Sequence, residues 1–181
     1  MFRNLFLVRV SEPAARVVHE DDLSSTVIVP VASVDEAVAA VGSAGDLDLI
    51  ELYGGLGIAA AAAVVAAAPG VPVGFAGDVG PTPAAAVLFE DPGADEDKHR
   101  WRFGSTTVVA VPSIQDAPAT AARLVAEGAT RVELCGGMGP VPAAAVRAAV
   151  EVPVTTVLFG FESLPAAAAY RARFESALPP D

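Results

Sequence analysis

The sequence has few of the residues on which several common protein classes depend. Of its 181 residues only Cys135 is a cysteine, so no disulfide can form within the chain. Only Lys98 is a lysine, and it stands in the charged run ADEDKHR, which is typical of a solvated surface. A lone cysteine fits a reducing compartment, and a solvated lysine is a poor candidate for Schiff-base chemistry.

Positive charge is also scarce. Eleven lysines and arginines stand against 22 aspartates and glutamates, which gives a formal net charge of −11. A surface of that sign repels a phosphate backbone, so we expect no nucleic-acid partner.

No segment predicts export or insertion into a membrane. The start, MFRNLFLVRV, lacks the longer apolar core and the cleavage site of a signal peptide. Residues 56–77 form an apolar run of membrane-span length, but Pro69 and Pro72 break its helical part. The corresponding stretch later in the chain carries Arg147 and Glu151. We therefore expect a cytoplasmic protein with no membrane partner.

What the sequence does contain is an internal repeat. Four pairs of features match: IELYGGLG (50–57) with VELCGGMG (132–139), STVIVPVASVDEA (25–37) with TTVVAVPSIQDA (106–117), GVPVGFAG (70–77) with EVPVTTVLFG (151–160), and His19 with His99. Agreement in several separate blocks predicts two fused copies of one unit. The first would span residues 1–81, and the second residues 82–181 with an additional C-terminal helix, in one compact unit.

Both halves alternate β-prone and helical segments, which is typical of an α/β protein with a parallel sheet covered by helices. Four βα units per half give eight in all, which predicts a compact barrel of the TIM type with pseudo-twofold symmetry. The alternative is two open parallel four-stranded α/β layers packed together. In either arrangement, residues 12–20 and 95–101 are expected to form short helices that carry the two histidines.

Each copy places a glutamate within an apolar strand. Glu51 and Glu133 alternate with aliphatic residues, so they should point away from the helices, near the carboxyl end of their strands. One interpretation is a pair of catalytic acid/base groups with raised pKa values. The other is a structural role in which each carboxylate accepts N–H bonds from a Gly-Gly turn.

The other candidate site residues lie close to these glutamates or in matching places of the two copies. Gly54, Gly55, Gly136 and Gly137 could bind a carboxylate or phosphate, or simply form tight turns. Arg9 would orient a substrate, and Tyr53, Cys135 and Glu90 would complete its binding site. His19 and His99 are candidate proton shuttles, or else partly exposed helical residues.

No cofactor or metal is expected. Gly55, Gly57 and Ala60 fit the dinucleotide pattern G-x-G-x-x-A, but the second copy breaks it with Pro140 and Pro142. The histidines lack the close spacing of common metal-ligand motifs.

Part of the chain resembles a known family. Residues 87–160, with GADEDKHR, VELCGGMG and VPVTTVLFG, resemble a small bacterial family of unknown function, whose members have roughly the length of one copy. The segment RVELCGG and the later VRAAVEVPV are also similar to the start of CutC-type copper-homeostasis proteins, which are βα barrels. The second resemblance implies only a fold.

These patterns favour a small-molecule enzyme of the lyase or isomerase type, without a cofactor, that uses carboxylate acid/base chemistry at the strand ends. Glu51 and Glu133 would be its acid/base pair. The alternative is a non-catalytic protein that binds a small ligand or serves as a scaffold. The sequence also leaves a homodimer open.

Overall fold

The computed structural model describes residues 1–177. Its strands are β1 (Phe2–Arg9), β2 (Val17–Glu20), β3 (Ser24–Val31), β4 (Leu49–Tyr53), β5 (Val73–Phe75), β6 (Ala85–Glu90), β7 (Arg100–Phe103), β8 (Thr106–Val111), β9 (Arg131–Leu134), β10 (Val154–Thr156) and β11 (Leu158–Phe159). Its helices are α1 (Val34–Ser43), α2 (Gly57–Ala67), α3 (Ala117–Ala126), α4 (Pro140–Ala149) and α5 (Leu164–Ala177).

The strands form two mixed sheets whose core order is the same. The first sheet has the order β11-β5-β4-β1-β3-β2, and the second has the order β10-β9-β6-β8-β7. Apart from β11, each strand of the first sheet has a counterpart at the same place in the second. In both sheets the central pairs are parallel, whereas the edge strands β2 and β7 pair antiparallel with β3 and β8.

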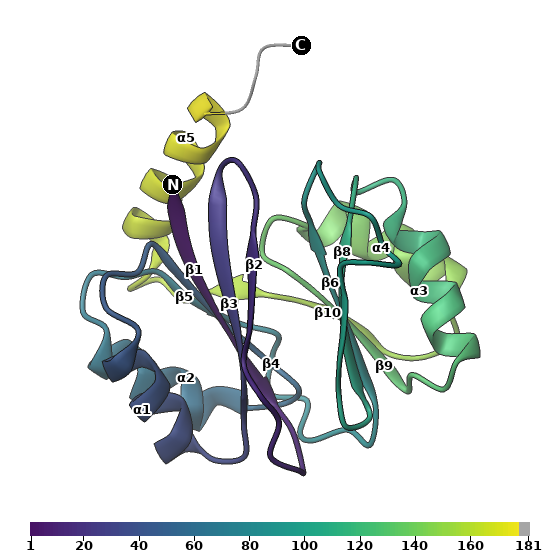
Figure 1. Cartoon of the computed structure of the whole chain (residues 1–181), viewed down its shortest axis with the longest axis horizontal. Helices are drawn as coiled ribbons and strands as arrows, with labels where there is room; N and C mark the ends of the chain where they lie inside the picture. The colour runs from purple at the N-terminus through teal and green to yellow at the C-terminus, as the bar shows by residue number, and fades with distance from the viewer. Residues whose placement is uncertain (178–181) are drawn as a thin grey trace.

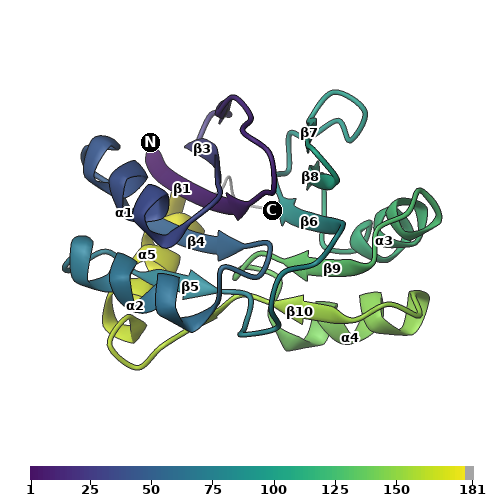
Figure 2. The same cartoon turned by 90° about the horizontal axis from the view of Figure 1, so that it is seen from below.

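The prediction of a closed barrel is not supported, because no closed barrel is found among the described strands. The alternative fits in its two sheet layers, but the sheets have six and five strands instead of four and carry antiparallel edge strands. Helices α1 and α2 lie on the outer side of the first sheet, and α3 and α4 on the outer side of the second (Figure 1). The arrowheads of β4 and β9 both point toward the middle of the molecule (Figure 2). The carboxyl ends of the strands in the two halves therefore meet at the centre.

The short helices expected at residues 12–20 and 95–101 are also wrong. Residues 17–20 form β2, and residues 100–103 form β7. A single helical turn is marginal in water, whereas a strand here gains the ladder of a hairpin with its neighbour. The first hairpin turns on Asp21, whose Oδ1 accepts the N–H groups of Leu23 and Ser24, both at 2.6 Å.

The alternating pattern of the strands divides the core as the sequence predicts. Leu7 and Leu52 face outward and pack in a cluster with residues of α1 and α2. Phe6 and Tyr53 face inward and join a second cluster that reaches the other sheet. In the alanine-rich helix α2, Ala60 is buried in the outward-facing cluster.

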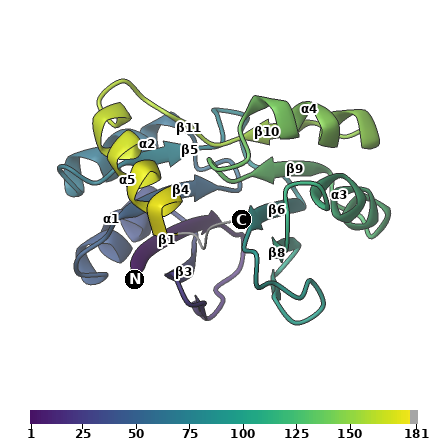
Figure 3. The same cartoon turned by 90° about the horizontal axis from the view of Figure 1, so that it is seen from above.

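The end of the chain returns to the first sheet (Figure 3). Strand β11 pairs antiparallel with β5, and α5 follows it. Tyr170 of α5 packs edge-on against Phe2 and donates its hydroxyl proton to Asn4 Oδ1 at 3.1 Å. Each helix within residues 1–177 is too short or too polar to cross a bilayer.

Candidate functional site

The two glutamates lie where the sequence predicts, on the inward faces of β4 and β9. Glu51 is 2% exposed and Glu133 is 0% exposed. A buried carboxylate needs partners, because removing the charge from water costs several kcal/mol. The partners of these two define what the pair can do.

Each glutamate accepts a backbone N–H from the glycine turn of the other half. Glu51 Oε1 accepts from Gly136 N at 2.9 Å, and Glu133 Oε2 accepts from Gly54 N at 2.7 Å. Gly54 and Gly136 are the first glycines of the two matching turns, and each stands three residues after the glutamate of its own half. The two bonds are therefore equivalent, and they run in opposite directions between the halves.

The remaining carboxylate oxygens are also occupied, but differently. Glu51 Oε2 accepts the hydroxyl proton of Tyr53. The second half of the chain has Cys135 at the position that matches Tyr53. There Arg131 is the partner: its Nε lies 2.7 Å and its Nη2 2.6 Å from Glu133 Oε1. Arg131 is itself buried, and its Nη1 donates to the carbonyl oxygen of Gly80 at 2.9 Å.

These surroundings shift the pKa values of the buried groups. Burial raises the pKa of Glu51 to about 7, although the bonds from Tyr53 and Gly136 favour the charged form. Burial also raises the pKa of Glu133, against the opposing pull of the Arg131 charge. Burial and the nearby Glu51 raise the pKa of the Cys135 thiol to about 12, so it stays protonated and is a poor nucleophile.

The N–H groups of the glycine turns do donate to a carboxylate, but that carboxylate belongs to a glutamate of the protein itself. In the first turn Gly54 and Gly55 have φ near +73° and +74°, a conformation that favours glycine. In the second turn Gly136 faces Glu51, while Gly137 is exposed.

Gly136→Ala is expected to lower the free energy of unfolding by about 1–3 kcal/mol. A Cβ at this position would lie 2.8 Å from Glu51 Oε1 and 2.7 Å from the ring of Phe159, so the cross-half bond would have to open. Gly137→Ala is the matched control, because its Cβ would meet only Cys135 Sγ, at 3.7 Å. Urea denaturation of both variants checks this, and equal stability of the two would contradict it.

Two other predicted site residues, Arg9 and Glu90, are the last residues of β1 and β6. Arg9 donates from Nη1 to the carbonyl oxygen of Gly55 at 3.4 Å. Glu90 is exposed, and its Oε1 accepts the N–H of Ile114 at 3.2 Å. Both contacts fix a neighbouring loop.

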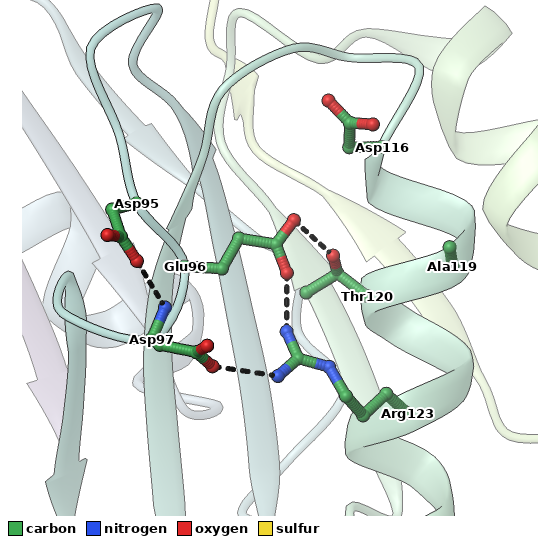
Figure 4. Close-up of a pocket in the computed structure, with 7 residues that line it drawn as sticks. All are labelled: Asp95, Glu96, Asp97, Asp116, Ala119, Thr120 and Arg123. Carbon is green, nitrogen blue, oxygen red and sulfur yellow. Dashed lines mark hydrogen bonds and ion pairs between the residues drawn. The ribbon is translucent and has the colours of Figure 1, made fainter.

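The larger of two described cavities lies away from the glutamates. It has a volume of about 420 Å³ and is lined by Asp95, Glu96, Asp97, Asp116, Ala119, Thr120 and Arg123 (Figure 4). Glu96 already pairs with Arg123 and accepts from the Thr120 hydroxyl at 2.7 Å. The smaller cavity, of about 200 Å³, lies beside Arg102 and Glu127. Neither lining includes Glu51, Glu133 or a histidine.

The structure brings together the two histidines, which the sequence left apart. His19 on β2 and His99 just before β7 have ring centroids 4.7 Å apart. Asp91, directly after β6, joins them: His19 Nε2 lies 2.7 Å from Asp91 Oδ2. One donor atom from each of the three residues lies within 4.8 Å of the others. We call these three residues the histidine cluster.

The histidine cluster is enclosed rather than solvated. His19 and Asp91 are buried, and His99 is partly buried. The ring of Trp101 stacks on that of His99 at 6.2 Å and lies 5.2 Å from that of His19. Phe89 contacts His19 from another side, at 5.8 Å between ring centroids. The expectation of partly exposed helical histidines is therefore wrong for His19.

One family model matches a segment in the second half of the chain. Residues 83–172 match DUF6506, a family of unknown function. The DUF6506 match includes Glu133, Asp91 and His99, whereas Glu51 and His19 lie outside it. Both the glutamate pair and the histidine cluster thus join residues inside the matched segment to the preceding part of the chain.

The other comparisons are remote. No curated protein matches the chain. One similar solved structure is an ABC domain in complex with L-Trp from Streptococcus pneumonia, with 11% identity and a TM-score of 0.31, covering 86% of this chain and 73% of that one. Another is an NtrC family transcriptional regulator from Clostridium acetobutylicum, with 12% identity and a TM-score of 0.34, covering 98% and 100%.

Two residues at these sites were missed from the sequence. Asp91 directly follows β6, and a position at the carboxyl end of a parallel strand is a signal for a ligand site. Arg131 stands two residues before Glu133, hence on the same face of β9. That spacing could have predicted the ion pair.

Proposed function

We propose that this protein is a non-catalytic small-ligand-binding protein whose site is the histidine cluster. In this proposal the chain consists of two fused copies of one unit. Glu51 and Glu133 join the copies, and the ligand binds where the edge strands β2 and β7 approach each other.

One observation carries the proposal: His19 on β2 converges with Asp91 and His99 at the two ends of the β6–β7 connection, with donor atoms within 4.8 Å. A buried hydrogen bond between His19 and Asp91 contributes only modestly to stability, so packing alone gives little reason to bring a second imidazole beside it. Convergent polar groups beside aromatic side chains are typical of ligand sites. Trp101 and Phe89 supply the aromatic contacts here.

The matching strand orders support the two-copy part of the proposal. The exchanged bonds between each glutamate and the opposite glycine turn support the joining role. Both oxygens of each glutamate already accept from protein donors, which leaves less acceptor capacity for a substrate. This favours the binding function over glutamate catalysis.

A thermal-shift screen with a metabolite set tests the proposed function. A ligand of the native state raises the apparent Tm by mass action. The shift should be lost in His99→Ala, which alters a partly buried residue, and kept in Asp97→Asn, whose side chain is 91% exposed. A shift that persists in His99→Ala and disappears in Glu51→Gln would instead place the ligand at the glutamates.

A lyase or isomerase is the second candidate, because one observation favours it. A pKa of about 7 suits Glu51 to gain and lose a proton at neutral pH. If a compound from the screen is turned over, Glu51→Gln should then reduce turnover by about 10²–10⁴-fold. Unchanged turnover in that variant would reject this candidate.

A further inference from the structure

We infer that the histidine cluster binds one divalent first-row transition-metal ion, of the Zn²⁺ or Fe²⁺ kind. This inference rests on the proposed function and names the class of ligand for the same site. His19, His99 and Asp91 are the protein ligands.

The donor set suits such an ion. Imidazole nitrogen together with carboxylate oxygen is a combination that zinc and non-haem iron sites use, whereas Ca²⁺ and Mg²⁺ prefer oxygen alone. The chain has only two histidines, and both lie in this cluster although 80 positions separate them. The other titratable member, Asp91, is buried and faces them.

The distances are close to those of a metal site. Metal–ligand bonds of about 2.0–2.2 Å in a tetrahedron place the ligand atoms about 3.3–3.6 Å apart. His19 Nε2 and Asp91 Oδ2 are 2.7 Å apart, and the whole set lies within 4.8 Å. An ion would replace the proton between His19 and Asp91, and His99 would move inward.

His99 is the ligand placed to make that movement. It is only partly buried and ends the turn between β6 and β7. Its Nδ1 accepts the N–H of Asp95 at 3.1 Å, so the neutral ring carries its proton on Nε2. Binding of the metal through Nε2 requires that proton to move to Nδ1 by way of solvent, so Nδ1 can no longer accept the N–H of Asp95.

The surroundings support a bound cation. Asp91 Oδ1 accepts the N–H of Gly93 at 2.9 Å, which orients the carboxylate as outer contacts do in metal sites. Trp101 and Phe89 limit the access of water and lower the local dielectric. The net charge of −11 favours the approach of cations. Three protein ligands leave a fourth position open, where a small molecule can bind the ion.

Metal titration of the full chain without an affinity tag tests the inference. ZnCl₂ is used in calorimetry and equilibrium dialysis, and CoCl₂ is used as a spectroscopic probe of coordination. We expect one ion per chain and a visible Co²⁺ spectrum. His99→Ala, His19→Asn and Asp91→Asn should each weaken binding by about 100-fold or more. Asp97→Asn should bind normally, because its carboxylate belongs to the acidic turn and not to the cluster.

His99→Ala decides the test if the variants of the two buried residues do not fold. Absence of binding to the folded chain, or equal binding by His99→Ala and the unaltered protein, would overturn the inference. Equal weakening by Asp97→Asn would also overturn it, because the acidic turn would then hold the ion. If metabolites still give a thermal shift that depends on His99, only the metal assignment fails; if neither metal nor metabolite binds, the proposed function fails as well.

Discussion

Glu133→Gln is expected to lower the free energy of unfolding by about 3–5 kcal/mol, because it leaves a buried arginine without its counter-charge. Arg131 and Glu133 are both buried and are joined by contacts of 2.6 and 2.7 Å. An amide in place of the carboxylate can still accept the N–H of Gly54. It cannot neutralise the guanidinium, and one of its two ends must act as a donor.

Glu51→Gln is the matched control for this expectation. Glu51 has no arginine beside it: its partners are the hydroxyl of Tyr53 and the N–H of Gly136. A glutamine can accept from Gly136 and donate to the tyrosine oxygen, so we expect no loss of stability at neutral pH. Urea denaturation measures the change in the free energy of unfolding for both variants, provided that their m-values equal that of the unaltered protein. Equal losses in the two variants would contradict the different roles assigned to the two carboxylates.

The stability of the protein is expected to fall by about 3 kcal/mol between pH 4.5 and pH 7 through Glu51 alone. Burial raises the pKa of Glu51 from the usual 4.5 to about 7 in the folded state. Below pH 4.5 the carboxyl is protonated in both states. As the pH rises, the unfolded chain releases the proton first while the folded protein retains it. Stability is therefore lost across this window and levels off above pH 7.

The difference between the unaltered protein and Glu51→Gln isolates this effect, because other carboxyl groups titrate in both. Denaturation curves at pH 5, 6, 7 and 8 should show the unaltered protein losing stability relative to the variant as the pH increases. A stability difference between the two proteins that stays constant over this pH range would contradict the raised pKa of Glu51.

The sequence predicted the general architecture from its periodicity. Alternation in segments such as LDLIELY and TRVELC identified strands, and it placed Glu51 and Glu133 opposite the aliphatic face. The two-layer alternative followed from the repeat. These features depend on local patterns of a few residues, which one sequence contains in full.

The edge strands were missed for a physical reason. Segments such as EPAARVVHE are too short for periodicity to separate a strand from a helical turn, and only pairing with a neighbouring strand decides between them. The dipeptide VV in the first segment and the tetrapeptide RWRF in the second are β-prone. A turn at Asp21 follows the first, and a turn at Gly104 follows the second. Those turn signals indicated hairpins.

The partners of the candidate site residues depend on how the two halves face each other. Nothing local shows that Glu51 reaches Gly136 rather than the glycine in its own turn, since the contact spans 85 positions. The same holds for His19 and Asp91, 72 positions apart. The matching sequence positions of the two histidines gave only a hint of their proximity.

Each glutamate accepts the first N–H of the opposite glycine turn. NMR observation of the Gly136 amide proton tests this arrangement most directly. A bond to Glu51 Oε1 makes this proton sensitive to the charge of a carboxyl whose pKa is about 7. We predict that the Gly136 amide shift titrates with a midpoint near pH 7 in the unaltered protein and loses this titration in Glu51→Gln. A Gly136 amide that does not titrate, or that titrates equally in the variant, would contradict the exchange of bonds between the halves.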